Sequence, residues 1–265
     1  MNGSPWFFEP IDMTRRRFYA PPTAFTSDRQ GVTLEADEAR HLRDVLRLKP
    51  GDEIHVFDGL GREFQCLIIE SGKGTAKLRI ISEATPSRPE SPLALTLAVA
   101  LLKGEKFDLV TQKVTELGVV RIVPVMTKLA DIRLRDANEA NKRVQRWQRI
   151  ALEAAKQSGR ALVPEVGKPV SFSSFVTGSK VQDQPKVMFS ERGGQSFSEF
   201  RNNVTEPPQS IIALVGSEGG WTDEEISLAR ENDWNIVTLS GRTLRAETAA
   251  ITAIALLQHT FGDLD

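Results

Sequence analysis

Residues 84–92 interrupt the chain with a segment that can form neither a helix nor a paired strand, because it carries three prolines within seven residues. Short β-type segments separated by turn residues precede it, whereas strands alternating with helices follow it. We therefore expect a domain boundary here. The predicted organisation is an N-terminal extension at 1–12, a β-barrel domain at 13–83, a linker at 84–92 and an α/β domain at 93–265.

The first domain is predicted to be a small all-β barrel that is interrupted by one helix. Strand-like segments at 54–57, 64–69 and 77–81 are separated by turns rich in Gly and Asp. Residues 36–48 carry apolar side chains at helical spacing, and Pro50 ends that pattern.

The second domain is predicted to be an α/β domain with a mainly parallel sheet. The continuous apolar run at 93–101 is typical of a strand that is buried on both faces. Further strands are expected at 121–125, 186–189, 211–215 and 236–239. Helices are expected at 107–117, at 141–158, from 222 onward, and at 248–261.

Local signals mark two helix ends in this domain. Thr222 and Glu225 have the spacing of a capping box, and Trp221 and Ile226 flank them at the spacing of a hydrophobic staple. Gly118 stands where a left-handed residue commonly ends a helix.

Two loops that join a strand to a helix are candidates for a binding site. Residues 215–220 read Val-Gly-Ser-Glu-Gly-Gly, and residues 239–248 hold Arg242, Arg245 and Glu247 beside a helix start. Ligands of open α/β sheets gather at the carboxyl ends of strands, where glycines let the backbone approach a ligand closely. Neither loop matches a phosphate-binding or dinucleotide-binding motif, and both can also be read as plain turns with local ion pairs.

Charge excludes one class of function. The chain has 34 Lys and Arg against 35 Asp and Glu, a net charge of −1, so bulk charge cannot coat nucleic acid. A local basic stripe is still present, because six charged side chains, five of them basic, follow one another at steps of three and four residues and so share one helical face. These are Lys142, Arg146, Arg149, Glu153, Lys156 and Arg160. Such a face is either merely solvated or tracks RNA phosphates, and arginines at 15–17 and at 40, 43 and 47 could extend it.

Cysteine and histidine add little chemistry. The single cysteine, Cys66, cannot form a disulfide within the chain, and the three histidines lack the spacing of metal ligands. No apolar run has the length of a membrane span, and no secretory signal is visible. We expect a cytoplasmic protein without a metal.

Several segments, taken in order, resemble the ribosomal RNA small subunit methyltransferase E family of the SPOUT class. No one of them is specific, but their combination covers nearly the whole chain from about Met13 to Asp263. The segments are 16–19, 41–47 with Gly51 and Asp52, 103–106, 113–118, 153–160, 216–220 and 244–249.

The resemblance implies a fold and an activity. The fold is an α/β trefoil-knot methyltransferase domain preceded by a PUA-like or OB-like β-barrel that binds RNA. The implied enzyme is a homodimer that uses S-adenosylmethionine to methylate N3 of a uridine in 16S ribosomal RNA of the small subunit.

The resemblance also assigns residues. Arg245, Glu218 and Glu247 are the expected catalytic residues, with Arg245 stabilising charge and a glutamate orienting it or accepting the proton. The expected cofactor contacts are Phe189, Ser190, Val215, Gly216, Gly219, Gly220, Leu239, Ser240, Leu244, Arg245 and Ala246. The expected RNA contacts are Arg15, Arg16, Arg17, Arg43, Arg47, Lys103, Arg146, Arg149, Lys156 and Arg160.

This chain departs from the family pattern in two places, and two other functions remain open. Ser217 stands where the family loop usually has proline, and residues 240–243 differ from the usual loop before Leu244. One alternative is a SPOUT methyltransferase that acts on another RNA, such as transfer RNA. The other is an inactive RNA-binding factor in ribosome assembly.

Overall fold

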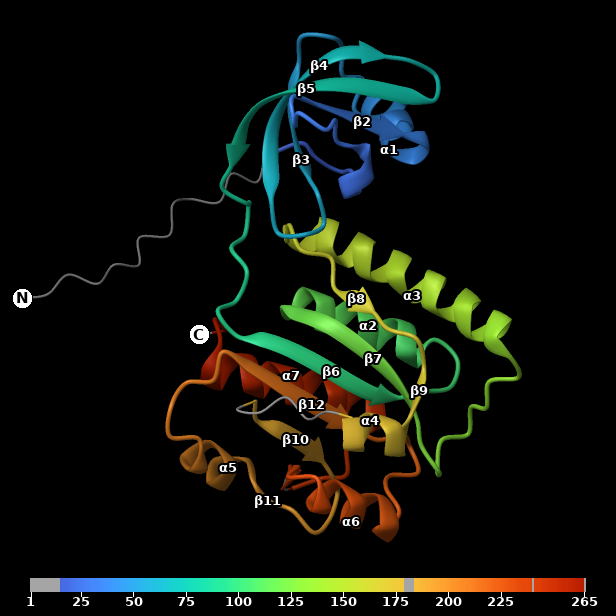
Figure 1. Cartoon of the computed structure of the whole chain (residues 1–265), viewed down its shortest axis with the longest axis vertical. Helices are drawn as coiled ribbons and strands as arrows, with labels where there is room; N and C mark the ends of the chain where they lie inside the picture. Colours follow the sequence, from blue (N-terminus) through green and yellow to red (C-terminus); the bar gives the residue numbers. More distant parts are fainter. Residues whose placement is uncertain (1–14, 179–183, 240, 265) are drawn as a thin grey trace, which may run out of the picture. The chain divides into compact units, whose positions relative to one another are not determined.

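A computed structural model describes residues 15–178, 184–239 and 241–264, which form two compact units (Figure 1). The first unit contains the described residues up to Glu90 together with Ala155–Val163. The second contains Ser91–Ala154 and the described residues from Pro164 onward. The division at Glu90 falls within the proline-containing segment. The return of 155–163 to the first unit has no signal in the local sequence, and the extension predicted at 1–12 lies outside the described residues.

The first unit is built on a five-stranded sheet in the order β1-β3-β4-β5-β2. Its strands are β1 (Arg17–Tyr19), β2 (Gly31–Glu35), β3 (Glu53–Phe57), β4 (Glu63–Ser71) and β5 (Thr75–Ala84). Strand β1 pairs with β3 in parallel, and the other pairs are antiparallel. Alternating side chains such as Leu34, Ile54 and Cys66 form one buried core, as expected for strands with one face turned inward.

The predicted helix of this unit is shorter and less regular than expected. An α-helix, α1, spans Ala36–Arg40 and continues as a π-helical segment, η2, at His41–Val45. A short 3-10 segment, η1, lies at Pro22–Ala24. The strand boundaries also extend the predicted ones by a few residues, which is usual because element ends depend on pairing partners.

The second unit contains a parallel sheet in the order β11-β13-β10-β12-β6-β7-β8, with β9 paired to β7. Every strand pair described in it is parallel, which confirms the predicted sheet. The strands are β6 (Ala94–Ala100), β7 (Val119–Met126), β8 (Glu165–Val166), β9 (Val170–Ser171), β10 (Lys186–Phe189), β11 (Gln195–Ser196), β12 (Ser210–Val215) and β13 (Asn235–Thr238).

Helices cover both faces of this sheet (Figure 1). Helices α2 (Lys106–Glu116) and α7 (Ala246–Phe261) contact each other, and α7 also contacts β12 and β6. Helices α4 (Phe172–Gly178) and α6 (Asp223–Glu231) contribute to an apolar cluster with inward side chains of β7, β10 and β12. Helix α3 spans Ala137–Ser158, and α5 spans Phe197–Asn203.

The two local signals predicted their helix ends correctly, whereas α3 and α7 begin four and two residues before the starts predicted at 141 and 248. Thr222 and Glu225 form the expected capping box, and Trp221 and Ile226 are both buried in the same cluster. Gly118 has φ +85°, as expected for a left-handed residue after α2. The short elements β8, β9, α4, β11 and α5 were not predicted, because each is too short to show a period.

We predict that Gly118→Ala destabilises the second unit by about 2 kcal/mol, because an L side chain is strained at this φ. An added Cβ would also lie 2.6 Å from Nε2 of Gln258, which donates a hydrogen bond to the carbonyl oxygen of Leu117 at 2.9 Å. Chemical denaturation measures the loss. Gly74→Ala is the control, since a Cβ at Gly74 meets no heavy atom within 4 Å. Equal stability of the two variants would contradict the prediction.

Candidate functional site

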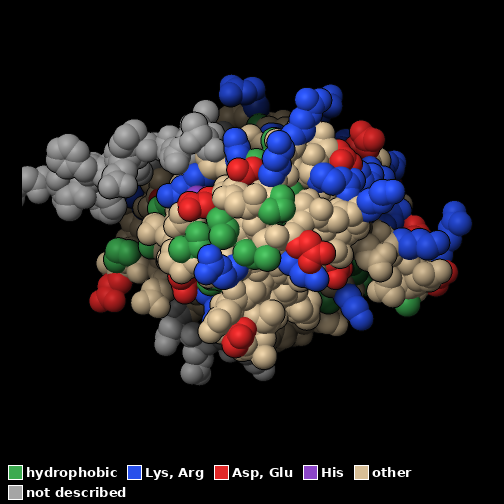
Figure 2. Space-filling view, turned by 90° about the horizontal axis from the view of Figure 1, so that it is seen from above, with side chains coloured by type: hydrophobic (Ala, Val, Ile, Leu, Met, Phe, Trp, Pro, Cys, Tyr) green, Lys and Arg blue, Asp and Glu red, His purple; other side chains and the backbone are tan. Residues whose placement is uncertain are grey.

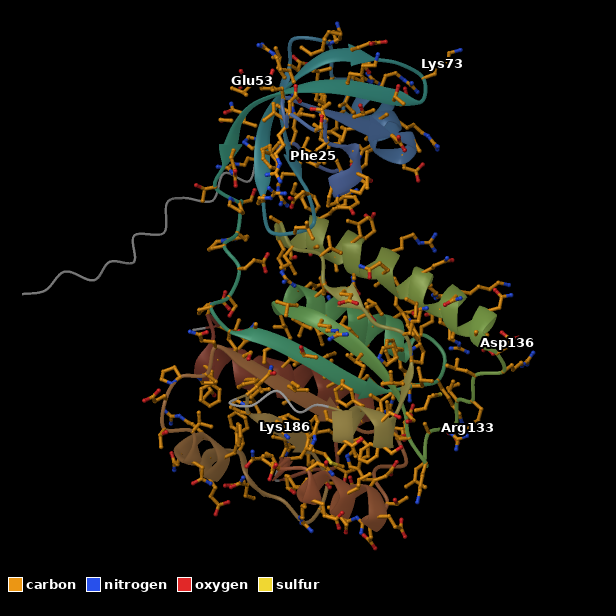
Figure 3. All side chains as sticks on the ribbon, in the orientation of Figure 1. Phe25, Glu53, Lys73, Arg133, Asp136 and Lys186 are labelled. Carbon is orange, nitrogen blue, oxygen red and sulfur yellow. The ribbon has the colours of Figure 1, made fainter. Side chains whose placement is uncertain are left out.

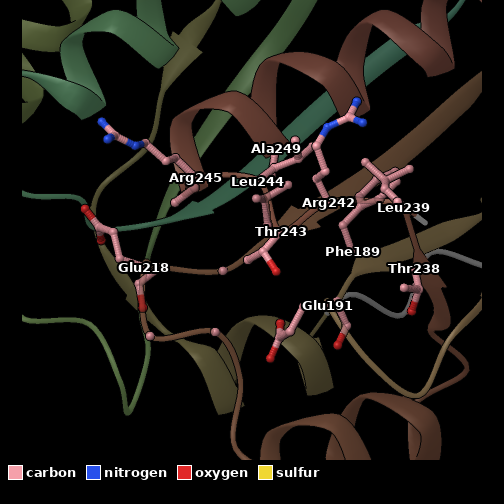
Figure 4. Close-up of a pocket in the computed structure, with 18 residues that line it drawn as sticks. Phe189, Glu191, Glu218, Thr238, Leu239, Arg242, Thr243, Leu244, Arg245 and Ala249 are labelled. Atoms are coloured by element: carbon pink, nitrogen blue, oxygen red, sulfur yellow. The ribbon is translucent and has the colours of Figure 1, made fainter.

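A cavity of about 560 Å³ opens where three neighbouring parallel strands end (Figure 4). Strand β10 pairs with β12 on one side and with β13 on the other, so their carboxyl ends share one edge of the sheet. The loop after each strand contributes to the wall: residues 189–191, 215–220, and 238–246 without residue 240. This is the edge at which ligands of open α/β sheets bind, and the volume lies within the range of about 300–1,000 Å³ for small-molecule sites.

The loop after β12, residues 216–220, is called the glycine loop here, and its glycines are packed too tightly to carry a side chain. A Cβ on Gly216 would lie 3.0 Å from the ring of Trp221, whose Nε1 donates to the carbonyl oxygen of Phe189 at 2.8 Å. Gly220 has φ +68°, and a Cβ there would lie 2.6 Å from Oε1 of Glu191. The glycines therefore let two strand ends and the loop approach one another closely.

The loop that follows β7 supports the glycine loop from outside. A Cβ on Gly219 would lie 2.8 Å from Cβ of Leu129 and 2.9 Å from its carbonyl oxygen. The backbone N–H of Lys128 donates to Oε1 of Glu225 at 2.9 Å. Nη2 of Arg133, a residue labelled in Figure 3, donates to the carbonyl oxygen of Lys128 at 2.8 Å. These bonds fix the wall against which Gly219 packs.

The structure brings the predicted cofactor residues together around this cavity. Ser240 lies outside the described residues. The other ten line the cavity, and they are Phe189, Ser190, Val215, Gly216, Gly219, Gly220, Leu239, Leu244, Arg245 and Ala246. They come from three loops that are separated by up to about fifty residues, so only the sheet order makes them neighbours.

Two of the three predicted catalytic residues line the cavity, and the third lies close to one of them. Glu218 and Arg245 both line it, and Figure 4 shows their side chains extending toward the same side. Glu247, in the first turn of α7, is mostly buried, with its side chain 13% exposed. Nζ of Lys106 lies 2.7 Å from Oε1 of Glu218 and 3.8 Å from Oε2 of Glu247.

Charge pairing sets the ionisation of this cluster. Partial burial alone would raise the pKa of Glu218, but the hydrogen bond from Lys106 and a backbone N–H outweigh it and lower that pKa. The same hydrogen bond to Glu218 raises the pKa of Lys106. The pair is therefore a carboxylate and an ammonium at neutral pH.

Ser217, the residue that replaces the family's proline, has an unusual environment. The residue is 7% exposed, and its Oγ has no hydrogen-bond partner in the described structure. Its carbonyl oxygen accepts from the N–H of Gly220 at 3.0 Å, which closes the tight loop. The loop geometry thus forms with serine in this position.

Sequence reasoning missed two charged residues of the site. Glu191 lines the cavity directly after β10, and its only sequence signal is that it follows a strand end. Lys106 lay within a segment that resembles the family, but its partner Glu218 is 112 residues away. No local pattern reveals such a pair.

Two of the expected RNA contacts have mostly buried side chains inside the first unit. Arg160 is 5% exposed, and its Nε and Nη2 donate to Oε2 of Glu90 at 2.9 Å and 2.7 Å. Nε of Arg17 donates to Oε2 of the fully buried Glu63 at 3.0 Å, and its Nη2 donates to the carbonyl oxygen of Arg160. These two guanidinium groups are themselves mostly buried, with side chains 11% and 6% exposed, and pair with carboxylates of the same unit, so a role in the fold explains them.

The other expected RNA contacts differ in how they are paired. Arg16, Arg47 and Arg149 are exposed. The remaining five form ion pairs: Arg15 with Glu63, Arg43 with Asp44, Lys103 with Asp131, Arg146 with Asp108, and Lys156 with Glu38. Figure 2 shows that Lys and Arg side chains are numerous on the face drawn, with Asp and Glu side chains among them.

Other kinds of site find little support in the part of the chain that the structure describes. It holds no cluster of three or more His, Cys, Asp or Glu side chains suited to a metal ion. No helix in the same residues has the length and apolar character to cross a membrane. Burial raises the pKa of Cys66 to about 12, so its thiol stays protonated and is a poor nucleophile.

Comparisons with known proteins agree with the two-unit architecture. Residues 89–258 match the model of an RNA methyltransferase domain, and residues 34–81 match that of an RNA methyltransferase PUA domain. The chain is 35% identical over 224 residues to ribosomal RNA small subunit methyltransferase E of Synechocystis sp., covering 84% of this chain and 71% of that protein. It is 30% identical to the Bacillus subtilis protein of the same name, covering 94% of each.

A solved structure is similar throughout. Ribosomal RNA small subunit methyltransferase E of Neisseria gonorrhoeae, bound to S-adenosylmethionine, superimposes with a TM-score of 0.82 at 35% identity. The match covers 95% of this chain and 100% of that one.

We predict opposite consequences for two arginines of the expected stripe. Arg160→Ala should lower the free energy of unfolding by about 3 kcal/mol, because it leaves the carboxylate of Glu90 without its cation. Arg149→Ala should change it by no more than about 0.5 kcal/mol, because Arg149 is exposed. Urea denaturation of both variants checks this. A stable Arg160→Ala protein would show that the pair has no structural role.

Proposed function

Because the chain belongs to the ribosomal RNA small subunit methyltransferase E family, we propose that it methylates N3 of a uridine in 16S ribosomal RNA with S-adenosylmethionine. The observation that carries this proposal is the cavity at the ends of β10, β12 and β13, which the expected cofactor residues line. The PUA match at 34–81 supports a first unit that binds RNA.

The cavity suits S-adenosylmethionine by its size and its lining. Its walls include a glycine loop in which added Cβ atoms would clash, so backbone groups border the space directly. The buried Oγ of Ser217 has no partner among the described residues and can serve a ligand's polar group. We infer that residues 189–190, 215–216, 219–220, 239–240 and 244–246 hold the cofactor.

The proposed reaction transfers one methyl group and releases one proton. When bound, S-adenosylmethionine supplies a methyl group on a positively charged sulfur that needs no further activation. The N3–H bond of uridine must give up its proton, and the freed electron pair forms the new N–C bond. The C–S bond breaks, and its electron pair stays on sulfur. The products are N3-methyluridine, S-adenosylhomocysteine and one proton.

The charged cluster handles that proton and the charge it leaves behind. Arg245 stands at the start of α7 and lines the cavity, where its guanidinium can stabilise negative charge that develops on the uracil ring. Glu218 or Glu247 accepts the proton or orients Arg245. The uridine has to leave any base pair or stack to reach the cavity.

RNA binding is assigned to exposed basic residues. Arg16, Arg47 and Arg149 are exposed, and Arg15, Arg43, Lys103, Arg146 and Lys156 can exchange their partners for phosphates. We do not assign this role to Arg17 and Arg160, because their own side chains are mostly buried, 11% and 6% exposed.

The proposal also includes a homodimer and a trefoil knot in the second unit. Helix α7 is apolar on most faces, and its side chains at Ile251, Ala255 and Leu256 are only partly buried. A second copy of the chain would cover that face. The chain runs from β13 through the cavity loop into α7, and this is the segment that the knot would thread.

The test is methylation of small ribosomal subunits and of free 16S RNA, followed by nucleoside analysis. We expect N3-methyluridine at one position. A modified transfer RNA would instead favour the alternative methyltransferase. Failure to bind S-adenosylmethionine in calorimetry at millimolar concentration would favour the inactive assembly factor and overturn the proposal.

We predict that Arg245→Ala lowers the single-turnover rate of methylation by roughly 100-fold, because one preorganised donor to the developing charge is lost. The affinity for S-adenosylmethionine, measured by calorimetry, should fall much less, since backbone groups hold the cofactor. A rate close to that of the wild-type protein would remove Arg245 from the catalytic role.

A further inference from the structure

Lys106 occupies a position that is electrostatically unfavourable unless another group compensates it. It is the first residue of α2, where the helix dipole and the free N–H groups repel a cation. It belongs to the segment 103–106, which resembles the family, and the proposed reaction gives it no task of its own. Its side chain is 35% exposed, so it could reach water, yet it turns to two carboxylates.

The two carboxylates belong to different elements beside the site. Glu218 lies in the glycine loop after β12, and Glu247 lies in the first turn of α7. Oε1 of Glu218 accepts a hydrogen bond from Nζ of Lys106 at 2.7 Å. Oε2 of Glu247 is buried, accepts no hydrogen bond from the described residues, and lies 3.8 Å from the same Nζ.

We propose that Lys106 is a positioning residue for methyl transfer, whose ammonium holds the carboxylates of Glu218 and Glu247 next to each other beside the cavity. The inference rests on the proposed function, because it assumes that one of these carboxylates accepts the uridine proton. Lys106 itself does not line the cavity and needs no contact with the substrate.

The charged groups around Glu218 explain why its pKa depends on Lys106. Arg245 and Glu247 face this region from α7, Glu191 lines the same cavity, and Lys103 pairs with Asp131 at 2.6 Å. Asp131 and partial burial both raise the pKa of Glu218, and Lys106 opposes them. Without Lys106, the pKa of Glu218 must therefore rise, and the carboxylate must take up a proton at a higher pH.

The experiment compares Lys106→Met, Lys106→Arg and the wild-type protein with saturating S-adenosylmethionine and small subunits. The single-turnover rate is measured against pH. As the pH is lowered, the methionine variant should begin to lose activity at a higher pH than the wild-type protein does. The ratio of its rate to the wild-type rate should be roughly tenfold lower on this acid limb than on the plateau. The arginine variant keeps a cation and should restore the wild-type profile.

Lys113→Met is the matched control, because Lys113 lies on the same helix and forms its own ion pair with Glu116. It should leave the pH profile unchanged. A Lys106→Met rate that is reduced by one constant factor at every pH, or is not reduced at all, would overturn the proposal.

A second measurement does not depend on turnover. In the protein without substrate, carbon-13 NMR of labelled glutamate carboxyl groups, assigned with Glu218→Gln, follows the titration of Glu218. Its midpoint should rise in Lys106→Met and should return in Lys106→Arg. An unchanged midpoint overturns the role of Lys106 even if the wild-type protein is active. Absence of N3-methyluridine with the wild-type protein, despite a shifted midpoint, overturns the proposed function and with it the role of Lys106 in methyl transfer.

Discussion

The parallel pairing of β10 with both β12 and β13 is the constraint on which the site depends. Parallel strands end at the same edge, so the three following loops meet although they are far apart in sequence. The hydrogen bond from Nε1 of Trp221 to the carbonyl oxygen of Phe189 ties two of these loops together at 2.8 Å. Gly216 permits this contact, because a Cβ would meet the Trp221 ring. The cavity is thus shaped by the strand order, by Trp221, and by the lack of a side chain at Gly216.

The net charge of −1 says little about the role of each charged residue, which depends on its local surroundings. In the first unit, Arg17 and Arg160 neutralise Glu63 and Glu90 in buried or half-buried surroundings. Removing one partner of such a pair is costly, because the other is left without compensation. Exposed cations such as Arg149 bear no such constraint and are available to an RNA phosphate. The same residue type therefore serves stability in one place and, in the proposed function, RNA binding in another.

Patterns that involve residues close in sequence predicted strands and helix ends well. Contacts between residues far apart in the chain left no pattern in the sequence. The capping box of Thr222 and the left-handed Gly118 depend on neighbours, and both were found. The buried-strand pattern also located β10 at its observed bounds. The stripe that included Arg160 was read from spacing alone, although α3 ends at Ser158 and Arg160 turns to Glu90. Predicted strand ends and glycines indicated the loops at 215–220 and 239–248, and the resemblance added residues 189–190, whose proximity to these loops arises from strand order.

The site breaks several local rules at once, and this supports its functional character. Lys106 and Arg245 place cations at the starts of α2 and α7, where the helix dipole disfavours them. Oγ of Ser217 and Oε2 of Glu247 are buried without hydrogen-bond partners in the described structure. Each of these features lowers stability when considered alone. The carboxylates of Glu218 and Glu247 offset the cation of Lys106, whereas the open hydrogen-bonding capacity of Ser217 and Glu247 is left for a ligand or a proton.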